Sequence, residues 1–421
     1  MDIIEVRGGR RLQGEVSVAG AKNAALPILF ATLLTDRPCT LRGLPDVVDV
    51  RTTLRLLEDL GARVERGADA VTIDAAGVHR HEASYDLVKT MRASFLVLGP
   101  LLARFGRARV SQPGGCAIGG RPVNLHVHGL RELGATIDLV HGYTEARAER
   151  LRGNRIHLDM PSVGATEHLL MVAAVAEGET TIENAACEPE VVDLAEALIA
   201  MGARISGAGE SIIRIAGVTA LGGLDYRIVP DRIEAGTFLM AAAITGGDVL
   251  VRNARADHLH AVIGKLREAG AEVSEEAPAG VRVRAAQRLR GVDFKTLPYP
   301  GFPTDLQAQM MAAMCVADGT SVISETIFEN RFMHAQELIR LGADITLEGH
   351  NAVVRGVPQL SGAPVMATDL RASVSLILAG LAAQHTTELR RVYHLDRGYE
   401  HIEQKLSQLG ADVRRVKGAR G

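Results

Sequence analysis

The sequence lacks the aromatic surface on which nucleic-acid-binding proteins stack bases. Its 421 residues include no tryptophan, and only 3% of them are aromatic, so few rings are available for stacking. The formal net charge of −3 gives no general attraction for nucleic acid, and an anionic ligand would need a local basic pocket. We therefore expect no nucleic-acid partner.

Cysteines and long apolar runs are also scarce. Cys39, Cys116, Cys187 and Cys315 form no CxxC pair, which argues against a zinc site or a disulfide framework and is typical of a reducing compartment. No stretch approaches the roughly 18 uninterrupted apolar residues of a membrane span, and the first residues lack the apolar core of a signal peptide. We expect a cytoplasmic protein without a membrane partner, divided into two or three domains.

A repeat is the main feature that the sequence does contain. Six helix-like stretches each end in a Gly-Ala pair followed by a β-prone run, and the pairs are 68 to 73 residues apart: Gly61, Gly134, Gly202, Gly270, Gly342 and Gly410. One folding unit of about seventy residues has therefore been copied along the chain. Each copy has the pattern of a βαβαββ unit, and its glycine is expected to be a left-handed helix cap.

The first helix expected in each repeat is apolar on most faces. The six stretches are PILFATLL, SFLVLGPLLA, LLMVAAVA, FLMAAAI, MMAAMCVA and VSLILAGLAA. A helix that is hydrophobic all round is buried, so we expect helices inside and sheets outside. Three repeats in each of two closed domains is the simplest division.

Polar residues at the starts of these helices form a second series. It comprises Lys22-Asn23, Arg92, Ser162-Val163-Gly164, Glu234, Asp305 and Arg371. Capping explains Ser162, while capping and function are both open for Asp305. Because a cation opposes the dipole at a helix N-terminus, Lys22, Arg92 and Arg371 indicate negative charge nearby. Arg121, Arg331 and Arg397 recur 11 to 13 residues before a Gly-Ala pair, either as solvated side chains or as parts of an anion site.

One loop differs from its counterparts in the other repeats. SQPGGCAIGGRPVNL surrounds Cys116 with four glycines and two prolines, which is typical of a mobile loop with close-approach positions. A thiol near arginines has a lowered pKa and can act as an acid or a nucleophile. No GK[ST] follows, so the loop is not a Walker sequence. The pairs His126/His128 and His258/His260 are interpreted as solvent-facing histidines, and no metal site is expected.

Several stretches of the chain resemble those of one family. They are GAKNAALPILFATLL, YDLVKTMRASFLVLGPLLARFG, PGGCAIGGRPVNLH, SVGAT, DRIEAGTFL, FPTDLQAQ, ENRFMH, MATDLRAS and HLDRGYE. They span the chain from end to end and closely resemble the UDP-N-acetylglucosamine 1-carboxyvinyltransferases, a group of enolpyruvyl transferases. The cysteine loop is specific, because EPSP synthase shares the fold without that loop.

The resemblance implies a fold and a reaction. The fold consists of two inside-out α/β barrel-like domains, 22–229 and 1–21 plus 230–421, each of three βαβαββ repeats, with the active site in the interdomain cleft. The reaction transfers the enolpyruvyl group of phosphoenolpyruvate to the 3′-hydroxyl of UDP-N-acetylglucosamine and releases phosphate, as the first committed step of peptidoglycan synthesis. No metal, organic cofactor or obligatory protein partner is implied.

The resemblance also implies roles for individual residues. Cys116 would be the general acid and the target of fosfomycin, Asp305 the base, and Lys22 and Arg397 further catalytic residues. The phosphoenolpyruvate site would comprise Lys22, Asn23, Cys116, Arg121, Arg331, Arg371 and Arg397. The nucleotide-sugar site would comprise Asn23, Arg92, Arg121, Pro122, Val123, Asn124, Leu125, Ser162, Val163, Gly164, Asp305 and Ile327. Asn124 departs from the Asp of many members, so a uracil-side contact would lose a charge and keep an acceptor.

Two other functions stay open at this stage. The first is a transferase of the same fold with another acceptor, such as shikimate 3-phosphate, or a member of the distant RNA 3′-terminal phosphate cyclase group. The loop PGGCAIGGRP argues against both. A low-activity paralogue that binds UDP-sugar is argued against by intact Cys116, Lys22, Asp305 and Arg397.

Overall fold

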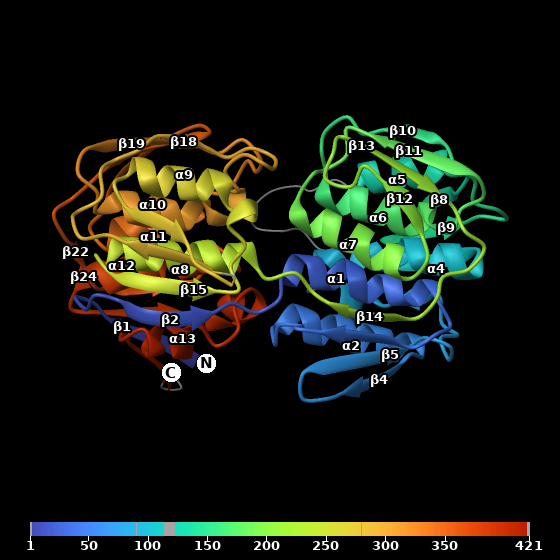
Figure 1. Ribbon diagram of the computed structural model, residues 1–421, viewed down its shortest axis with the longest axis horizontal. Coiled ribbons are helices and arrows are strands. Elements are labelled where there is room, and N and C mark those ends of the chain that lie inside the picture. Colours follow the sequence, from blue (N-terminus) through green and yellow to red (C-terminus); the bar gives the residue numbers. More distant parts are fainter. Residues whose placement is uncertain (1, 90, 113–122, 279, 419–421) are drawn as a thin grey trace. The chain divides into compact units, whose positions relative to one another are not determined.

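The computed structural model describes residues 2–89, 91–112, 123–278 and 280–418, apart from the side chain of Arg92, and it consists of two compact units (Figure 1). The N-unit comprises the described residues of 20–229, and the C-unit comprises 2–19 and those of 230–418. Each unit has its own hydrophobic core. Among the described helices, none is long and apolar enough to cross a membrane.

Three largely buried helices lie at the centre of each unit. In the C-unit, α8, α10 and α12 contact one another, and in the N-unit α6 contacts both α1 and α4. Their bounds are Lys22–Ala31 (α1), Leu98–Phe105 (α4), Val163–Ala173 (α6), Arg232–Ile244 (α8), Gln307–Cys315 (α10) and Ser373–Ala382 (α12). The expectation that apolar helices lie inside is confirmed.

A second set of helices is amphipathic and ends at the repeated glycines. These helices are Val48–Leu60 (α2), Asn124–Glu132 (α5), Pro189–Ala200 (α7), His260–Glu268 (α9), Met333–Arg340 (α11) and Ile402–Gln408 (α13). The six glycines that follow them all have φ between +92° and +109°, a range that favours glycine. Their prediction as left-handed caps is confirmed.

Six four-stranded sheets repeat one strand order. A first strand pairs in parallel with a second, and the second pairs antiparallel with one strand of a hairpin. The N-unit sheets are β14-β3-β5-β4 (Leu224–Arg227, Cys39–Arg42, Ala70–Asp74, Arg63–Arg66), β6-β7-β9-β8 (Glu82–Ala83, Arg107–Ser111, Tyr143–Arg147, Thr136–Val140) and β10-β11-β13-β12 (Arg155–His157, Glu179–Glu183, Ile212–Ala216, Arg204–Ser206). The predicted βαβαββ repeat is thereby confirmed.

The C-unit sheets follow the same order, except that in the last sheet the two strands of the antiparallel pair, β1 and β26, come from opposite ends of the chain instead of from a hairpin. They are β2-β15-β17-β16 (Gln13–Ser17, Asp248–Arg252, Gly280–Arg284, Glu272–Glu275), β18-β19-β21-β20 (Phe294–Lys295, Thr320–Ser324, Asn351–Arg355, Asp344–Glu348) and β23-β25-β1-β26 (Pro364–Met366, Thr386–Arg390, Asp2–Arg7, Asp412–Lys417). Shorter elements are Tyr85–Val88 (α3), the pair Leu360–Ser361 (β22) and Ala383–Gln384 (β24), and the 3₁₀ segments Thr32–Leu34 (η1), Arg92–Val97 (η2), Ala256–His258 (η3), Thr304–Leu306 (η4) and Val392–Arg397 (η5).

Two repeats exchange their first strands. The strand β2 precedes α1 of the N-unit in the chain, yet it pairs in parallel with β15 of the C-unit. The strand β14 precedes α8 of the C-unit, yet it pairs in parallel with β3 of the N-unit. The unit boundaries at 19/20 and 229/230 therefore fall just after a strand instead of at the end of a repeat.

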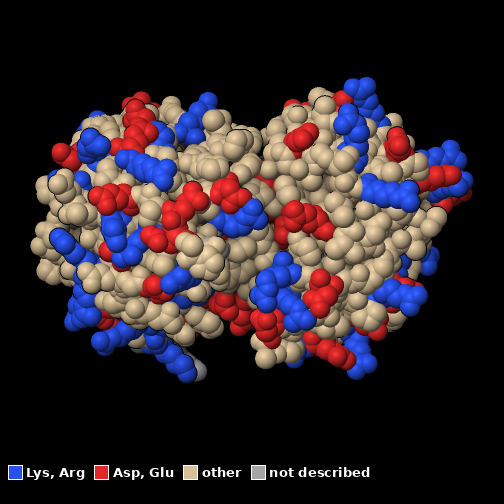
Figure 2. Space-filling view, viewed as in Figure 1, with Lys and Arg blue, Asp and Glu red and all other residues tan. Residues whose placement is uncertain are grey.

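The surface carries charges of both signs. On the face drawn in Figure 2, lysine and arginine side chains intermingle with aspartate and glutamate over each unit. This mixture agrees with the small net charge of −3.

Candidate functional site

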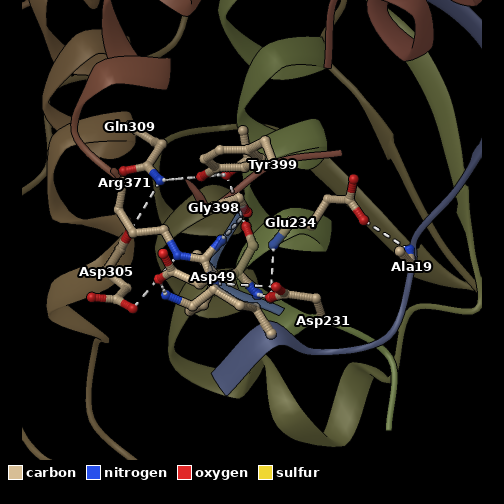
Figure 3. A network of polar contacts seen from close by, with 12 residues as sticks. Ala19, Asp49, Asp231, Glu234, Asp305, Gln309, Arg371, Gly398 and Tyr399 are labelled. Carbon is tan, nitrogen blue, oxygen red and sulfur yellow. Dashed lines mark hydrogen bonds and ion pairs between the residues drawn. The ribbon is translucent and has the colours of Figure 1, made fainter. Parts of the chain in front are cut away.

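Arg371 is the centre of a buried polar network in the C-unit (Figure 3). Its side chain is 1% exposed and its Nη2 lies 3.2 Å from Asp231 Oδ2. Its Nη1 donates to the carbonyl of Gly398 over 2.9 Å, and its guanidinium lies over the ring of Tyr399. Burial lowers the pKa of Arg371, but Asp231, Tyr399 and Asp305 more than offset this effect and raise it. The guanidinium is therefore permanently charged and fixed in place.

Asp305 links this network to Arg331. Its Oδ1 accepts from Arg331 Nη2 over 2.8 Å, and its Oδ2 lies 3.7 Å from Arg371 Nε. Both arginine side chains are buried, at 5% and 1% exposure, while that of Asp305 is 22% exposed. Burial lowers the pKa of Arg331, and Asp305 and Asp369 raise it to above its ordinary value. Two cations and one partly accessible carboxylate are thus held together.

Hydrogen bonds to Glu325 hold the surrounding backbone. Thr304, next to Asp305, accepts from Arg331 Nη1 over 3.1 Å and donates to Glu325 Oε2 over 2.9 Å. The backbone N–H of Ile327 donates to Glu325 Oε1 over 2.9 Å. The buried Glu325 therefore positions Arg331 and the predicted nucleotide-sugar residue Ile327 at the same time.

Arg397 is the neighbour in the chain of Gly398, whose carbonyl accepts from Arg371. It is half-buried at the end of η5, directly before Gly398. Asp369 Oδ1 accepts from the backbone N–H groups of Arg371 and Ala372, at 2.7 Å each, and so holds the turn that precedes α12. The structure brings Asp305, Arg331 and Arg371 into contact, and Arg397 directly precedes Gly398, which Arg371 contacts.

Two sequence interpretations are corrected here. Asp305 is not a helix cap, because its carboxylate faces Arg331 and α10 begins without a side-chain cap. Arg331 is not a solvated surface side chain, since its ion pair with Asp305 compensates its burial. The negative charge expected near Arg371 is present as Asp231. The partner Asp231 was missed; the signal was the cation of Arg371, which calls for a nearby negative charge.

The N-unit contributes a second group of predicted residues. Lys22 begins α1, is 6% exposed, and its Nζ lies 3.2 Å from Asp49 Oδ2. Asn23 follows on the same helix and is half-buried. Asp49 supplies negative charge at this helix start, and it too was missed because it lies 27 residues away in the chain.

Two further helix starts lie in this unit. Ser162 is the N-cap of α6, as expected, and its Oγ accepts from the N–H of Ala165 over 3.4 Å. Val163 and Gly164 form the first turn of α6, where backbone N–H groups lack intrahelical partners. Val123, Asn124 and Leu125 lie at the start of α5, with Asn124 exposed. The contact between α5 and α6 brings these two starts together.

The histidine interpretation is partly wrong. His126 is half-buried and packs against His168 and Phe95, and the side chain of His258 is only 12% exposed, whereas His128 and His260 face solvent. Within the described ranges, no group of three or more His, Cys, Asp or Glu side chains is arranged to hold a metal ion.

Other predicted residues lie outside this description. Cys116, Arg121 and Pro122 are not among the described residues, and Arg92 is placed by its backbone alone, at the start of η2. Their predicted roles stay predictions.

Comparison with known proteins identifies the family. The family model of EPSP synthase (3-phosphoshikimate 1-carboxyvinyltransferase) matches residues 6–406. The UDP-N-acetylglucosamine 1-carboxyvinyltransferase of Geotalea daltonii is 60% identical over 417 residues, covering 99% of this chain and 100% of the relative, and that of Myxococcus xanthus is 58% identical over 420 residues with the same coverage. This chain belongs to the UDP-N-acetylglucosamine 1-carboxyvinyltransferase family.

Solved structures agree with this assignment at the level of the fold. The enolpyruvyl transferase NikO from Streptomyces tendae superimposes with a TM-score of 0.89 at 28% identity, and 99% of each chain is covered. EPSP synthase from Acinetobacter baumannii has a TM-score of 0.79 at 20% identity, covering 99% of this chain and 100% of that chain. The predicted enolpyruvyl transferase fold is confirmed.

Proposed function

We propose that this protein transfers the enolpyruvyl group of phosphoenolpyruvate to the 3′-hydroxyl of UDP-N-acetylglucosamine and releases phosphate, the first committed step of peptidoglycan synthesis. The observation that carries the proposal is identity of 57 to 60% over 99% of the chain to relatives that are named for this activity. The cluster of Asp305, Arg331 and Arg371 supports it, because the reaction needs a base beside cations that hold an anionic substrate.

Phosphoenolpyruvate, an anion, would bind to several of the predicted cations. Arg331 and Arg371 offer guanidinium groups to its carboxylate, since planar N–H donors match that group. Lys22 and Arg397, with Arg121, are the proposed partners of its phosphate. The nucleotide sugar would contact Asn23, Asp305, Ile327 and the starts of η2, α5 and α6.

Asp305 would change partner during the reaction. Its carboxylate now neutralises Arg331 and lies near Arg371. When the carboxylate of phosphoenolpyruvate pairs with these arginines, it replaces Asp305 as their counterion. Asp305 is then available to accept the proton of the 3′-hydroxyl, which makes it the general base.

The proposed chemistry is an addition followed by an elimination. Cys116 gives a proton to C3 of phosphoenolpyruvate while the 3′-oxygen bonds to C2 and passes its proton to Asp305. The thiolate of Cys116 then takes a proton back from C3, and phosphate leaves C2 with the proton that Asp305 holds, which restores the double bond and both side chains. Cys116 is also the proposed site of a covalent adduct with phosphoenolpyruvate and of alkylation by fosfomycin.

One alternative acceptor is suggested by the family model, whose description names 3-phosphoshikimate. The identity to EPSP synthase structures is 20%, against 60% to the UDP-N-acetylglucosamine enzymes. The nucleotide sugar is therefore the acceptor that we propose.

Phosphate release from phosphoenolpyruvate tests the proposal directly. We expect release with UDP-N-acetylglucosamine and none with shikimate 3-phosphate, and we expect dialysis against EDTA to leave the rate unchanged. Release only with shikimate 3-phosphate would reassign the acceptor, and release with neither would refute a transferase function. The assay with each of the two acceptors serves as the control for the assay with the other.

A cytoplasmic location is part of the proposal. Cys39, Cys187 and Cys315 are free thiols, which is typical of a reducing compartment. Cell fractionation with detection of the native protein would test it, and recovery from the periplasm would contradict it.

A further inference from the structure

A pair of histidines contacts the segments that carry the predicted nucleotide-sugar residues of the N-unit. His168, on α6, is 0% exposed, and its Nδ1 lies 2.9 Å from Nδ1 of His126, on α5. The rings of both histidines pack edge-on against Phe95 of η2. The pair therefore joins the three segments that carry Arg92, Asn124 and Ser162.

One hydrogen bond determines which ring nitrogen of His168 carries the proton. The backbone N–H of Gly99, in the first turn of α4, donates to His168 Nε2 over 2.7 Å. Burial, followed by His126, lowers the pKa of His168 well below its ordinary value, so the ring is neutral. A neutral ring whose Nε2 accepts carries its proton on Nδ1.

The position of the proton on His168 then determines which ring nitrogen of His126 carries its proton. Since His168 Nδ1–H is the donor of the short contact, Nδ1 of His126 is the acceptor. In the neutral His126 ring the proton must lie on Nε2, which makes Nε2–H a donor.

Glycines shape the space around both rings. A Cβ on Gly99 would lie 2.4 Å from the His168 ring, so only glycine admits the ring there. A Cβ on Gly164 would lie 3.3 Å from His126 Cε1 and 3.5 Å from its Nε2. The Nε2 edge of His126 is thus directed at the Ser162-Val163-Gly164 turn.

We propose that His168 is a positioning residue that holds His126 as an Nε2–H donor to an acceptor oxygen of the nucleotide sugar at the Ser162-Val163-Gly164 turn. This inference rests on the proposed function for the identity of the ligand. The arrangement of protons rests on the geometry alone. His168 acts through His126 and touches no substrate.

Nitrogen-15 NMR of histidine-labelled protein tests the proton arrangement without substrate. The signals are assigned with His126→Phe and His168→Phe. We expect His168 to carry its proton on Nδ1 and His126 on Nε2. Protonation of His126 on Nδ1 would overturn the inference, whatever reaction the protein catalyses.

Titration with UDP-N-acetylglucosamine tests the positioning role. In His168→Phe, which keeps a ring but no donor, we expect Kd and KM for the nucleotide sugar to rise about three- to tenfold, the worth of about one hydrogen bond, with kcat at saturation nearly unchanged. In His168→Asn the amide N lies where Nδ1 was and can donate to His126, so affinity should largely return. His128→Phe, at an exposed position of the same helix, is the matched control.

The outcomes separate this inference from the proposed function. Unchanged affinity in folded His168→Phe would overturn it, as would equal losses of affinity and thermal stability in His168→Phe and His168→Asn, which indicate a structural role alone. Absence of UDP-N-acetylglucosamine binding by the wild type would refute the proposed function and the ligand named here. The NMR result would still decide the proton arrangement.

Discussion

Replacing Asp305 by Asn separates its two proposed roles, counterion and base. The substitution preserves the size of the side chain and one acceptor oxygen, but it removes the negative charge between Arg331 and Arg371. A base that can no longer accept a proton should cost about 10²- to 10⁴-fold in kcat. The affinity for phosphoenolpyruvate should increase, because the carboxylate that competes for the arginines is gone.

The size of that second effect follows from the ion pair. A hydrogen bond to a charged group contributes about 1.5–3 kcal/mol and a neutral one about 1 kcal/mol. In the variant, residue 305 therefore binds Arg331 about 0.5–2 kcal/mol more weakly and competes less with phosphoenolpyruvate. Phosphoenolpyruvate should therefore bind about two- to thirtyfold more tightly. The same loss should lower the free energy of unfolding by about 0.5–2 kcal/mol, because Arg331 keeps Thr304 as an acceptor.

Steady-state kinetics with both substrates, together with thermal unfolding, provide the measurement. Chemistry in the variant is slow relative to dissociation, so KM for phosphoenolpyruvate approaches Kd. Asp231→Asn is the matched control: Asn can still cap α8, but the variant leaves Arg371 without its buried partner, so stability should fall more, by about 3 kcal/mol, and kcat less. A wild-type kcat in Asp305→Asn would refute its role as base, and weaker phosphoenolpyruvate binding would refute the exchange of counterions.

The remaining predictions concern separate parts of the molecule. Cys116→Ser should lose turnover and alkylation by fosfomycin while keeping UDP-N-acetylglucosamine affinity; label on another cysteine, found by mass spectrometry, would contradict this. Gly202→Ala should lower the free energy of unfolding by about 1–2 kcal/mol, the cost of a side chain at φ +106°; no clash adds to it, since no atom lies within 4 Å of the new Cβ. Gly264→Ala, in the exposed interior of α9, should instead raise the free energy of unfolding by about 0.5–1 kcal/mol. Burial raises the pKa of Asp193 from 3.8 to about 6. The folded state therefore binds the proton more tightly, and the free energy of unfolding should fall by up to about 3 kcal/mol as pH rises from about 4 to 6. Asp193→Asn should remove that part of the pH dependence in denaturant titrations, and an unchanged slope would contradict the assignment.

Local features of the sequence predicted most of the secondary structure. A Gly-Ala pair after an apolar-periodic stretch needs a left-handed residue at the helix end, and all six glycines have positive φ. Uniformly apolar stretches predicted buried helices because no face of such a helix suits water. Both signals lie within a few residues of the feature that they predict.

Pairing over long distances could not be predicted in this way. Each repeat has the same local pattern, so the sequence does not show that β2 pairs with β15 and β14 with β3. The choice depends on contacts more than 150 residues apart, to which periodicity is insensitive. For the same reason the sequence indicated that Arg371 needs an anion but not that Asp231, 140 residues away, supplies it.

The candidate residues of the C-unit and those of the N-unit differ in how the sequence reveals them. In the C-unit, Asp305, Arg331 and Arg371 all stand in motifs that resemble the family, and the structure gives each an ionic partner. In the N-unit, His168 stands in no motif of the predicted site, yet its ring contacts the helices that carry several of those residues. Burial explains the difference. A charged side chain at a helix start signals in the sequence that an opposite charge lies nearby, whereas a neutral histidine needs only a backbone N–H and a second ring. Residues that position a site through neutral hydrogen bonds therefore have to be found in the structure.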